Sequence, residues 1–359
     1  MKLIYSLALT ASLLASATSC RDNSPVEVGA DSPYIHYMGR LDRTNPAEPA
    51  FSFPGTTAML SFEADSVAMH VSPGSGYFVV EIDSLAPQKV CFGPTDSVMT
   101  LGRDLGEGLH NLRVTYCIEG YEKSPRWRGF TLSPGAKLHE PAVPEGPKIE
   151  FIGNSITCGY GTDAEGPEIH FSYDTENHCL SYAHQTARLL DADYYVVARS
   201  GSGIYRNYNG PREGSPDGTI PSEYDNTLIY CPDVKWDFST WQPDVVCINL
   251  GTNDTSLGNY DIALFGERYG EFLSHLRSVY PDAKFVLLTG SMLHGKALDD
   301  VRHTLDSLAA SRPGVMRFDM SEETGELGYG ADYHPSPRRA ALNAVELSQF
   351  IANEVLPSN

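Results

Sequence analysis

Two residues far apart in the sequence carry side chains suited to nucleophilic catalysis. Ser155 stands in residues 153–157 (GNSIT), directly after the apolar run 148–152. A serine hydroxyl is a weak nucleophile, so it needs an adjacent base and donors that stabilise the oxyanion formed by its attack. His334, in residues 332–335 (DYHP), supplies such a base. We therefore predict that Ser155 is a nucleophile and that His334 is its general base.

Both residues also have common structural uses. A serine that follows a strand often caps the next helix, because its hydroxyl accepts a backbone N–H. The chain has 11 histidines, and most of them are expected in the core or on the surface. The segment around Ser155 does not by itself separate a cap from a nucleophile. Oxyanion donors elsewhere in the chain must decide between them.

Two further motifs offer those donors. Asn253 stands in residues 251–254 (GTND) and Gly201 in residues 199–203 (RSGSG), and each motif follows a predicted strand. Gly201 has no side chain to block the approach of a substrate oxygen to its N–H. Together with the Ser155 N–H, these groups form a predicted oxyanion hole. A phosphate-binding loop is disfavoured because the third glycine and a Lys-Ser or Lys-Thr pair are missing, whereas a plain turn at Asn253 stays open.

The elements that must position these residues begin with a strand-rich region. Residues 34–133 contain short alternating or β-branched runs, such as 58–62 and 77–82, with a hairpin turn expected at 74–76. No long helical period interrupts them, so they predict an all-β sandwich domain. Residues 134–147 are rich in proline and predict a stiff linker that cannot join a central strand.

Residues 148–359 alternate short apolar strands with amphipathic helices. This alternation predicts an α/β domain with a parallel sheet and helices on both faces, whose functional loops leave the carboxyl ends of the strands. We predict strands at 148–152, 194–198, 245–250, 285–288 and 315–318, and helices at 181–190, 272–279, 298–308 and 336–355. The motifs of Ser155, Gly201 and Asn253 each follow one of these strands, so we expect them at one edge of the sheet.

Residues 1–20 predict an export signal of the lipoprotein type. A basic residue precedes the apolar run 3–14, which is shorter than the roughly 20 residues of a transmembrane helix. Residues 17–20 (ATSC) are similar to a bacterial lipobox, so Cys20 is the predicted lipid anchor, with ordinary cleavage near Cys20 as the alternative. Residues 21–33 then predict a tether. We expect the chain to be exported to the periplasm or cell surface and held on a bacterial membrane.

Composition excludes other classes of function. The chain of 359 residues has a formal net charge of -20 and no basic stretch, so we expect no nucleic-acid partner, because phosphates would be repelled. The cysteines form no pair or Cys/His cluster with zinc-like spacing, so no metal site is predicted. Their pairing in disulfides stays open. The serine chemistry described above requires no cofactor.

Four segments, 153–155 (GNS), 200–201 (SG), 251–254 (GTND) and 332–335 (DYHP), resemble in order and spacing the four blocks of the SGNH hydrolase superfamily. Longer segments resemble carbohydrate esterase family 2, and the resemblance covers nearly the whole chain after the export signal. Those segments are 155–161 (SITCGYG), 175–177 (TEN), 181–183 (SYA) and 200–208 (SGSGIYRNY). The resemblance implies a jelly-roll-like sandwich joined to a three-layer SGNH-type domain, and an esterase that removes O-acetyl groups from polysaccharides such as xylan or mannan.

Two positions depart from the superfamily pattern. Asn154 replaces the usual Asp before the nucleophile, although an amide can also order the turn. The acid that orients the histidine is usually three residues before it, where this chain has Ala331, and Asp332 stands one residue too late. Members of family 2 can use a backbone carbonyl, which fixes the imidazole tautomer without adding charge. We therefore favour a dyad of Ser155 and His334, with Asp332 as the alternative third member.

Aromatic residues near these blocks are candidates for stacking on a sugar ring, although such residues more often pack in a core. They are Tyr160, Tyr205, Trp241 and Tyr333. The resemblance implies an acetylated plant polysaccharide or oligosaccharide as substrate, cleaved through an acetyl-serine. A glycan-binding protein on the same scaffold is one alternative. A lipase or thioesterase is another, but the polar run 205–217 does not suggest the apolar groove that a long acyl chain needs.

Overall fold

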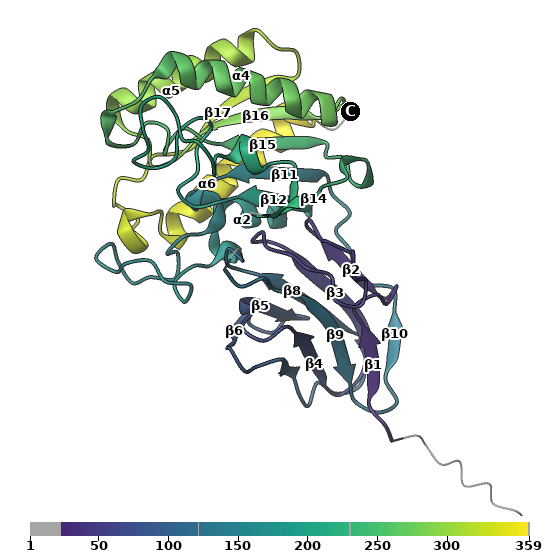
Figure 1. Cartoon of the computed structure of the whole chain (residues 1–359). Helices are drawn as coiled ribbons and strands as arrows, with labels where there is room; N and C mark the ends of the chain where they lie inside the picture. The colour runs from purple at the N-terminus through teal and green to yellow at the C-terminus, as the bar shows by residue number, and fades with distance from the viewer. Residues whose placement is uncertain (1–22, 121, 230, 358–359) are drawn as a thin grey trace, which may run out of the picture.

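The computed structural model describes residues 23–120, 122–229 and 231–357. The predicted export signal and Cys20 lie outside the described residues. Figure 1 shows the N-terminal strands gathered at one end of the molecule and the mixed strands and helices at the other. Within the described ranges, no helix has both the length and the apolar character needed to cross a membrane.

The N-terminal part is the predicted β-sandwich. In the described part of the chain, one sheet has the order β1-β9-β4-β7 and the other the order β10-β3-β8-β5-β6, with β2 also paired to β3. Aromatic rings fill the space between the sheets, and the rings of Phe51 and Trp127 stack with centroids 4.8 Å apart. The strands are β1 (Val26–Gly29), β2 (Ile35–Met38), β3 (Thr57–Glu63), β4 (Val67–Val71), β5 (Gly76–Ile82), β6 (Gln88–Phe92), β7 (Val98–Gly102), β8 (His110–Tyr116), β9 (Trp127–Leu132) and β10 (Lys137–His139).

The sandwich extends beyond the residues that the sequence predicted for it. Strand β1 lies inside the predicted tether and pairs with β9, and β10 lies inside the predicted linker and pairs with β3. Both are short edge strands with at most one buried side chain, so their sequences show little alternation. The hairpin predicted at residues 74–76 is also wrong, because the turn joins β4 and β5, which belong to different sheets.

The second part is the predicted α/β domain. Its parallel sheet has the order β12-β11-β15-β16-β17, and neighbouring residues of one strand face opposite sides. On β15, Val246 and Ile248 pack in one apolar cluster with residues of α4 and α5, whereas Val245 and Cys247 pack in another with residues of α2 and α6. The strands are β11 (Lys148–Gly153), β12 (Asp193–Ala198), β15 (Val245–Asn249), β16 (Lys284–Thr289) and β17 (Val315–Asp319).

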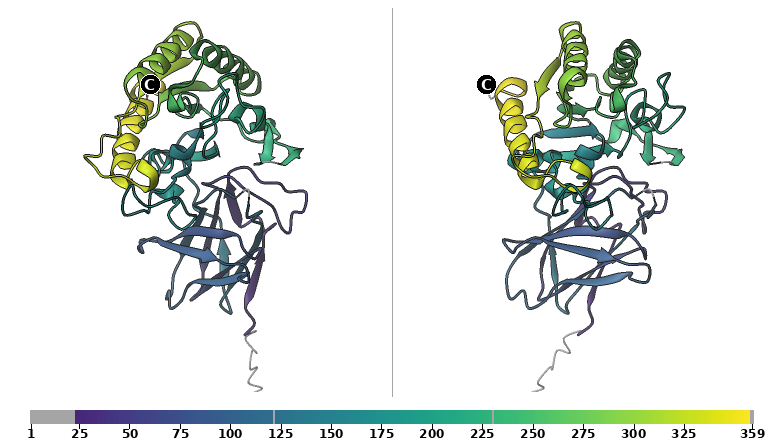
Figure 2. Two further views of the ribbon diagram at one scale, coloured as in Figure 1. Left: turned by 60° about the vertical axis from the view of Figure 1, so that its left-hand side comes forward. Right: turned by 90° about the vertical axis from the view of Figure 1, so that its left-hand side faces the viewer.

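Figure 2 shows the C-terminal helix α6 and helix α4 on opposite sides of this sheet. The helices are α1 (Ser155–Cys158), α2 (Tyr182–Leu189), α3 (Ile220–Glu223), α4 (Ile262–Val279), α5 (Gly295–Ala310) and α6 (Pro337–Phe350). A small hairpin of β13 (Asn226–Leu228) and β14 (Cys231–Lys235) stands apart from the main sheet. The six cysteines within the described ranges are all free.

Candidate active site

Strand β11 delivers Ser155 to the carboxyl edge of the parallel sheet. The strand ends at Gly153, and Asn154 caps α1 by accepting the N–H of Ile156 at 3.1 Å. Gly153 is required there, because a Cβ on it would lie 2.0 Å from the Thr157 hydroxyl oxygen. Ser155 is therefore the first residue of a one-turn helix and keeps 8% of its surface exposed. The amide of Asn154 orders this turn, as expected for a residue in place of the usual Asp.

His334 lies beside Ser155. Its Nε2 is 2.9 Å from the Ser155 Oγ, and its Nδ1 is 3.2 Å from the backbone carbonyl oxygen of Ala331. A carbonyl only accepts hydrogen bonds, so Nδ1 carries the hydrogen and Nε2 is left to accept the Ser155 proton. Burial lowers the pKa of His334 to about 4, although its bond to the Ala331 carbonyl raises it in part. The imidazole is therefore neutral at physiological pH.

Asp332 does not orient His334, which corrects its prediction as a third member. Its carboxylate accepts the Tyr160 hydroxyl at 2.8 Å and the Phe171 N–H at 3.0 Å, and it contacts the His170 Nδ1 at 2.8 Å. Asp332 lies in a short 3₁₀ turn, Ala331–Tyr333, with a left-handed φ of 48°. This backbone turns the carboxylate toward the loop of residues 160–171, while the Ala331 carbonyl faces the imidazole.

Tyr160 supports the histidine from the side. Its ring stacks on the imidazole of His334 with centroids 4.0 Å apart, and the Phe171 ring stacks on Tyr160 at 4.4 Å. Because its hydroxyl is also bonded to Asp332, Tyr160 joins the histidine turn to the loop that follows α1. The structure thus brings Tyr160 to the site, but its ring packs against His334 rather than in a position predicted for a sugar.

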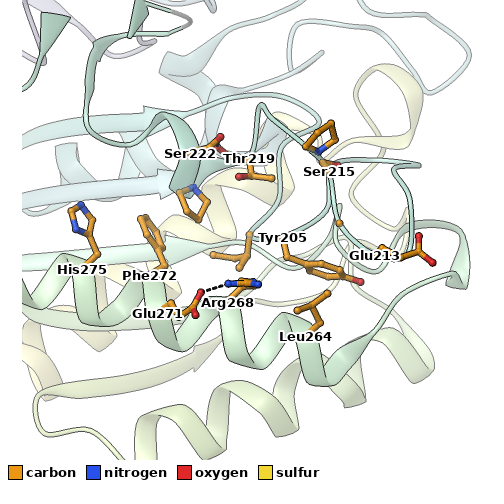
Figure 3. Close-up of a pocket in the computed structure, with 14 residues that line it drawn as sticks. Tyr205, Glu213, Ser215, Thr219, Ser222, Leu264, Arg268, Glu271, Phe272 and His275 are labelled. Atoms are coloured by element: carbon orange, nitrogen blue, oxygen red, sulfur yellow. Dashed lines mark hydrogen bonds and ion pairs between the residues drawn. The ribbon is translucent and has the colours of Figure 1, made fainter. Parts of the chain in front are cut away.

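Two predicted sugar-binding residues lie elsewhere. Trp241 is 6% exposed, stacks on Tyr195 with centroids 4.0 Å apart, and donates its indole N–H to Asp193, which begins β12 at the opposite edge of the sheet from Ser155. Tyr205 is 5% exposed, and its hydroxyl accepts the N–H of Asp261 at 2.8 Å. Figure 3 shows its ring between its own loop and α4, in a hollow of about 680 Å³ that neither Ser155 nor His334 lines. Neither ring is available to a sugar at Ser155.

The predicted oxyanion donors follow the two strands that flank β11. Gly153 of β11 pairs with Ala198 of β12 and Asn249 of β15, so the loops carrying Gly201 and Asn253 leave the sheet on either side of Ser155. Gly201 has a φ of 78°, and a Cβ built on it would meet nothing within 4 Å, so its surroundings are open.

Hydrogen bonds from the GTND motif hold the loop of residues 200–206. One N–H of the Asn253 amide donates to the Ser202 carbonyl at 2.8 Å, which leaves its second hydrogen for a ligand. The buried Asp254 carboxylate accepts the N–H groups of Ile204 and Tyr205, each at 2.9 Å. Burial raises the pKa of Asp254 to about 6, and these backbone bonds oppose the shift. The GTND motif thus fixes the neighbouring loop as well as offering a donor.

Two exposed tyrosines flank this arrangement. Tyr333 is 54% exposed, precedes His334 and donates its hydroxyl to Glu168 at 3.0 Å. Tyr208 is 62% exposed, and its backbone N–H donates to the Gly201 carbonyl at 2.8 Å. Sequence reasoning predicted a sugar contact for Tyr333 and assigned no role to Tyr208. Only its place in residues 200–208, a segment that resembles carbohydrate esterase family 2, distinguished Tyr208 from the other tyrosines.

Comparisons with known proteins agree with this architecture. Residues 37–141 match the family described as Carbohydrate esterase 2 N-terminal, and residues 151–342 match the GDSL-like Lipase/Acylhydrolase family. The chain is 35% identical over 331 residues to the Cellulase/esterase CelE of Acetivibrio thermocellus, covering 90% of this chain but 40% of CelE. It is 29% identical to an acetylxylan esterase/glucomannan deacetylase of Cellvibrio japonicus, covering 97% of this chain and 98% of that enzyme.

A solved structure gives the same result. A family two carbohydrate esterase from Clostridium thermocellum, in complex with cellohexaose, superposes with a TM-score of 0.82 at 34% identity, covering 89% of this chain and 99% of that one. Both parts of the chain are matched, in the same order. The chain therefore belongs to carbohydrate esterase family 2, a group of carboxylic ester hydrolases with a GDSL-like catalytic domain.

Proposed function

We propose that this protein is a serine esterase that removes O-acetyl groups from carbohydrate, with Ser155 as nucleophile and His334 as general base. The observation that carries the proposal is the 2.9 Å contact between the Ser155 Oγ and the His334 Nε2, with Nδ1 bonded to the Ala331 carbonyl. This geometry supplies a base in the correct tautomer without a carboxylate.

The reaction begins when His334 takes the proton of Ser155 and the serine oxygen attacks the acetyl carbonyl. The N–H groups of Ser155 and Gly201 and the free N–H of Asn253 stabilise the oxyanion. Collapse of this intermediate breaks the ester bond, and His334 passes its proton to the departing sugar oxygen, which becomes a hydroxyl. His334 then takes a proton from water, and the water oxygen attacks the acetyl-serine. Collapse of this second intermediate breaks its bond to the Ser155 oxygen, which recovers the proton from His334, and acetate is released. No cofactor takes part in these steps.

We propose an acetylated xylan- or mannan-type polysaccharide or oligosaccharide as substrate. The names of the Cellvibrio relatives, acetylxylan esterase/glucomannan deacetylase, support this class. The exposed rings of Tyr208 and Tyr333 offer apolar faces on which a sugar can stack.

The decisive experiment compares wild type with Ser155→Ala. We expect wild type to release acetate from acetylated xylan, acetylated glucomannan and a chromogenic acetate ester, and the folded variant to release none. Acetate release retained by Ser155→Ala would overturn the assignment. Glycan affinity without turnover in wild type would favour the binding-protein alternative, and a preference for long acyl chains would favour a lipase or thioesterase.

We also propose export to the periplasm or cell surface with a lipid anchor at Cys20. The support is the lipobox-like segment 17–20, which follows a basic residue and an apolar run. Cys20→Ala should move the protein from the membrane fraction to the soluble fraction. An unchanged membrane fraction would contradict the anchor.

A further inference from the structure

Two glutamates that no catalytic step uses are buried side by side beneath the oxyanion loop. Glu119 follows β8 in the sandwich, and Glu176 lies in the loop between α1 and α2. They are 2% and 0% exposed, and the Glu119 N–H donates to a Glu176 carboxyl oxygen at 3.2 Å. Carboxyl oxygens of the two side chains lie within 4.8 Å of each other. Buried acidic side chains are uncommon because the charged form loses its hydration.

Glu119 accepts two hydrogen bonds from Ser200, the residue before Gly201. One of its carboxyl oxygens accepts the Ser200 N–H at 2.7 Å, and the other accepts the Ser200 hydroxyl. Asn253 and Asp254 hold the same loop on the far side of Gly201, at residues 202 and 204–206. Glu119 therefore fixes the loop on its near side, and it comes from the sandwich domain.

The pair is chemically consistent with one shared proton. Two ionised carboxylates have no donor between them and repel each other in a buried site. The Glu176 Oε1 is buried and has no hydrogen-bond partner within the described ranges, and a proton there supplies a donor. Burial and the neighbouring Glu119 charge raise the pKa of Glu176 well above its ordinary value. Burial also raises the pKa of Glu119, but the two hydrogen bonds from Ser200 oppose that shift and favour its ionised form.

We propose that Glu176 holds a proton at neutral pH and shares it with an ionised Glu119, and that Glu119 is a positioning residue that fixes Ser200 and thereby the Gly201 N–H for the oxyanion. This inference rests on the proposed function, which assigns Gly201 to the oxyanion hole. It also gives the sandwich domain a part in catalysis: one of its side chains sets the geometry of the hydrolase loop.

The Cys158 thiol lies next to the pair, and together these three residues are the one group within the described ranges whose donor atoms are close enough to hold a metal ion. Both oxygens of Glu119 already accept from Ser200, and burial keeps the pKa of the Cys158 thiol well above its ordinary value, so the thiol is neutral. These contacts favour a shared proton over a metal ion. Metal content is measured in the test.

Three variants of the pair and one stability control separate positioning from stability. In Glu119→Gln only the side-chain carbonyl accepts a hydrogen bond, so one donor of Ser200 is left unpaired. We expect kcat to fall about 10- to 100-fold with KM nearly unchanged, which is less than the fall of about 100- to 1000-fold when an oxyanion donor is removed outright. Glu176→Gln should keep kcat within about threefold of wild type, because its amide donates as the protonated acid does. Glu176→Ala should lose kcat because it removes the donor to Glu119. Glu150→Gln, a buried change at the start of β11, is the stability control and should lower the melting temperature only.

The dependence of kcat on pH tests the shared proton, because a purely structural role of the pair would not change it. Loss of the shared proton at high pH leaves two buried charges, so kcat should fall on the alkaline side in wild type, and this fall should vanish in Glu176→Gln, which cannot ionise. The other titratable or charged groups that face the pair are Tyr116 on β8, Cys117 just after β8, Cys158 on α1, Tyr160 after α1, Arg199 after β12, and Lys89 on β6 with its ion-pair partner Asp163. The Glu176→Gln comparison leaves all of them unchanged.

An infrared difference spectrum between wild type and Glu176→Gln tests the proton without any substrate. We expect a carboxylic acid C=O band at neutral pH that the variant lacks, and this result stands even if wild type proves to have no esterase activity. Absence of the band, a stoichiometric metal ion in the purified protein, or full kcat in a folded Glu119→Gln would each overturn the inference.

Discussion

The ring of Tyr160 lies flat against the imidazole of His334, with centroids 4.0 Å apart and planes inclined by 24°. This contact holds one face of the imidazole, whereas the hydrogen bonds of His334 hold its two ring nitrogens. Tyr160→Ala should lower kcat up to about tenfold, because such ring pairs contribute about 0.5–1.5 kcal/mol and about 1.4 kcal/mol corresponds to a factor of ten in rate. Tyr160→Phe keeps the stack and should lose less. Steady-state kinetics on a small acetate ester measures both, and equal rates in Tyr160→Ala and wild type would contradict the role.

The pKa of His334 determines the acid limb of activity. Because burial lowers this pKa from 6.5 to about 4, the imidazole stays neutral, and able to accept a proton, at any pH well above 4. We expect kcat/KM to stay level between pH 7 and pH 6 and to fall only as the pH drops toward about 4, where imidazolium forms. His170→Asn should leave this limb unchanged, since His170 is exposed and contacts Asp332 rather than Ser155. A limb centred near 6.5 would contradict the expectation.

The absence of a side chain at Gly161 leaves room for Ala331, whose carbonyl orients His334. A Cβ at this position would lie 2.3 Å from the Ala331 Cβ and 2.8 Å from the Ala331 nitrogen, and its φ is 63°. Gly161→Ala should therefore displace the Ala331 carbonyl and lower kcat by about 100-fold, the typical cost of a misplacement of about 1 Å. Gly166→Ala is the matched control in the same loop, because a Cβ there meets nothing within 4 Å. Comparable kcat in the two variants would rule out this role for Gly161.

Tyr208 and Tyr333 should recognise the glycan rather than the acetyl group. Replacing either by alanine should raise KM for an acetylated oligosaccharide about three- to tenfold, since an aromatic contact contributes about 0.5–1.5 kcal/mol, and should leave KM for a small acetate ester unchanged. Tyr34→Ala, an exposed tyrosine of the sandwich at 39%, is the control. Equal KM values for the oligosaccharide in all variants would remove both residues from the substrate site.

A buried ion pair joins the two domains in the first half of β11, away from the carboxyl end that carries Ser155. Arg40 of the sandwich and Glu150 of β11 are both fully buried and lie 3.1 Å apart. Arg40→Met should lower the free energy of unfolding by about 3–5 kcal/mol, because it leaves the Glu150 charge unpaired. The double variant Arg40→Met/Glu150→Met should recover part of this loss. Denaturant unfolding measures both, and a single variant as stable as wild type would contradict the pairing.

The sequence by itself determined the domain types and pointed to Ser155 and His334 as the candidate reacting residues. The apolar runs of β11, β12 and β15 are buried on both faces and therefore read clearly as strands of a parallel sheet. Since the carboxyl ends of parallel strands share one edge, the motifs of Ser155, Gly201 and Asn253 had to meet there. The edge strands β1 and β10 were missed because edge strands bury too little to leave a pattern.

Only the tertiary structure decided which groups surround those residues. Whether Asp332 or the Ala331 carbonyl meets His334 depends on a left-handed turn, which residue types alone do not specify. The same holds for Tyr205 and Trp241, whose rings turn into packed interiors, and for Glu119, which reaches Ser200 from 81 residues away in the sequence. Local patterns record which face of an element is buried, but contacts between distant segments depend on how the two domains pack together.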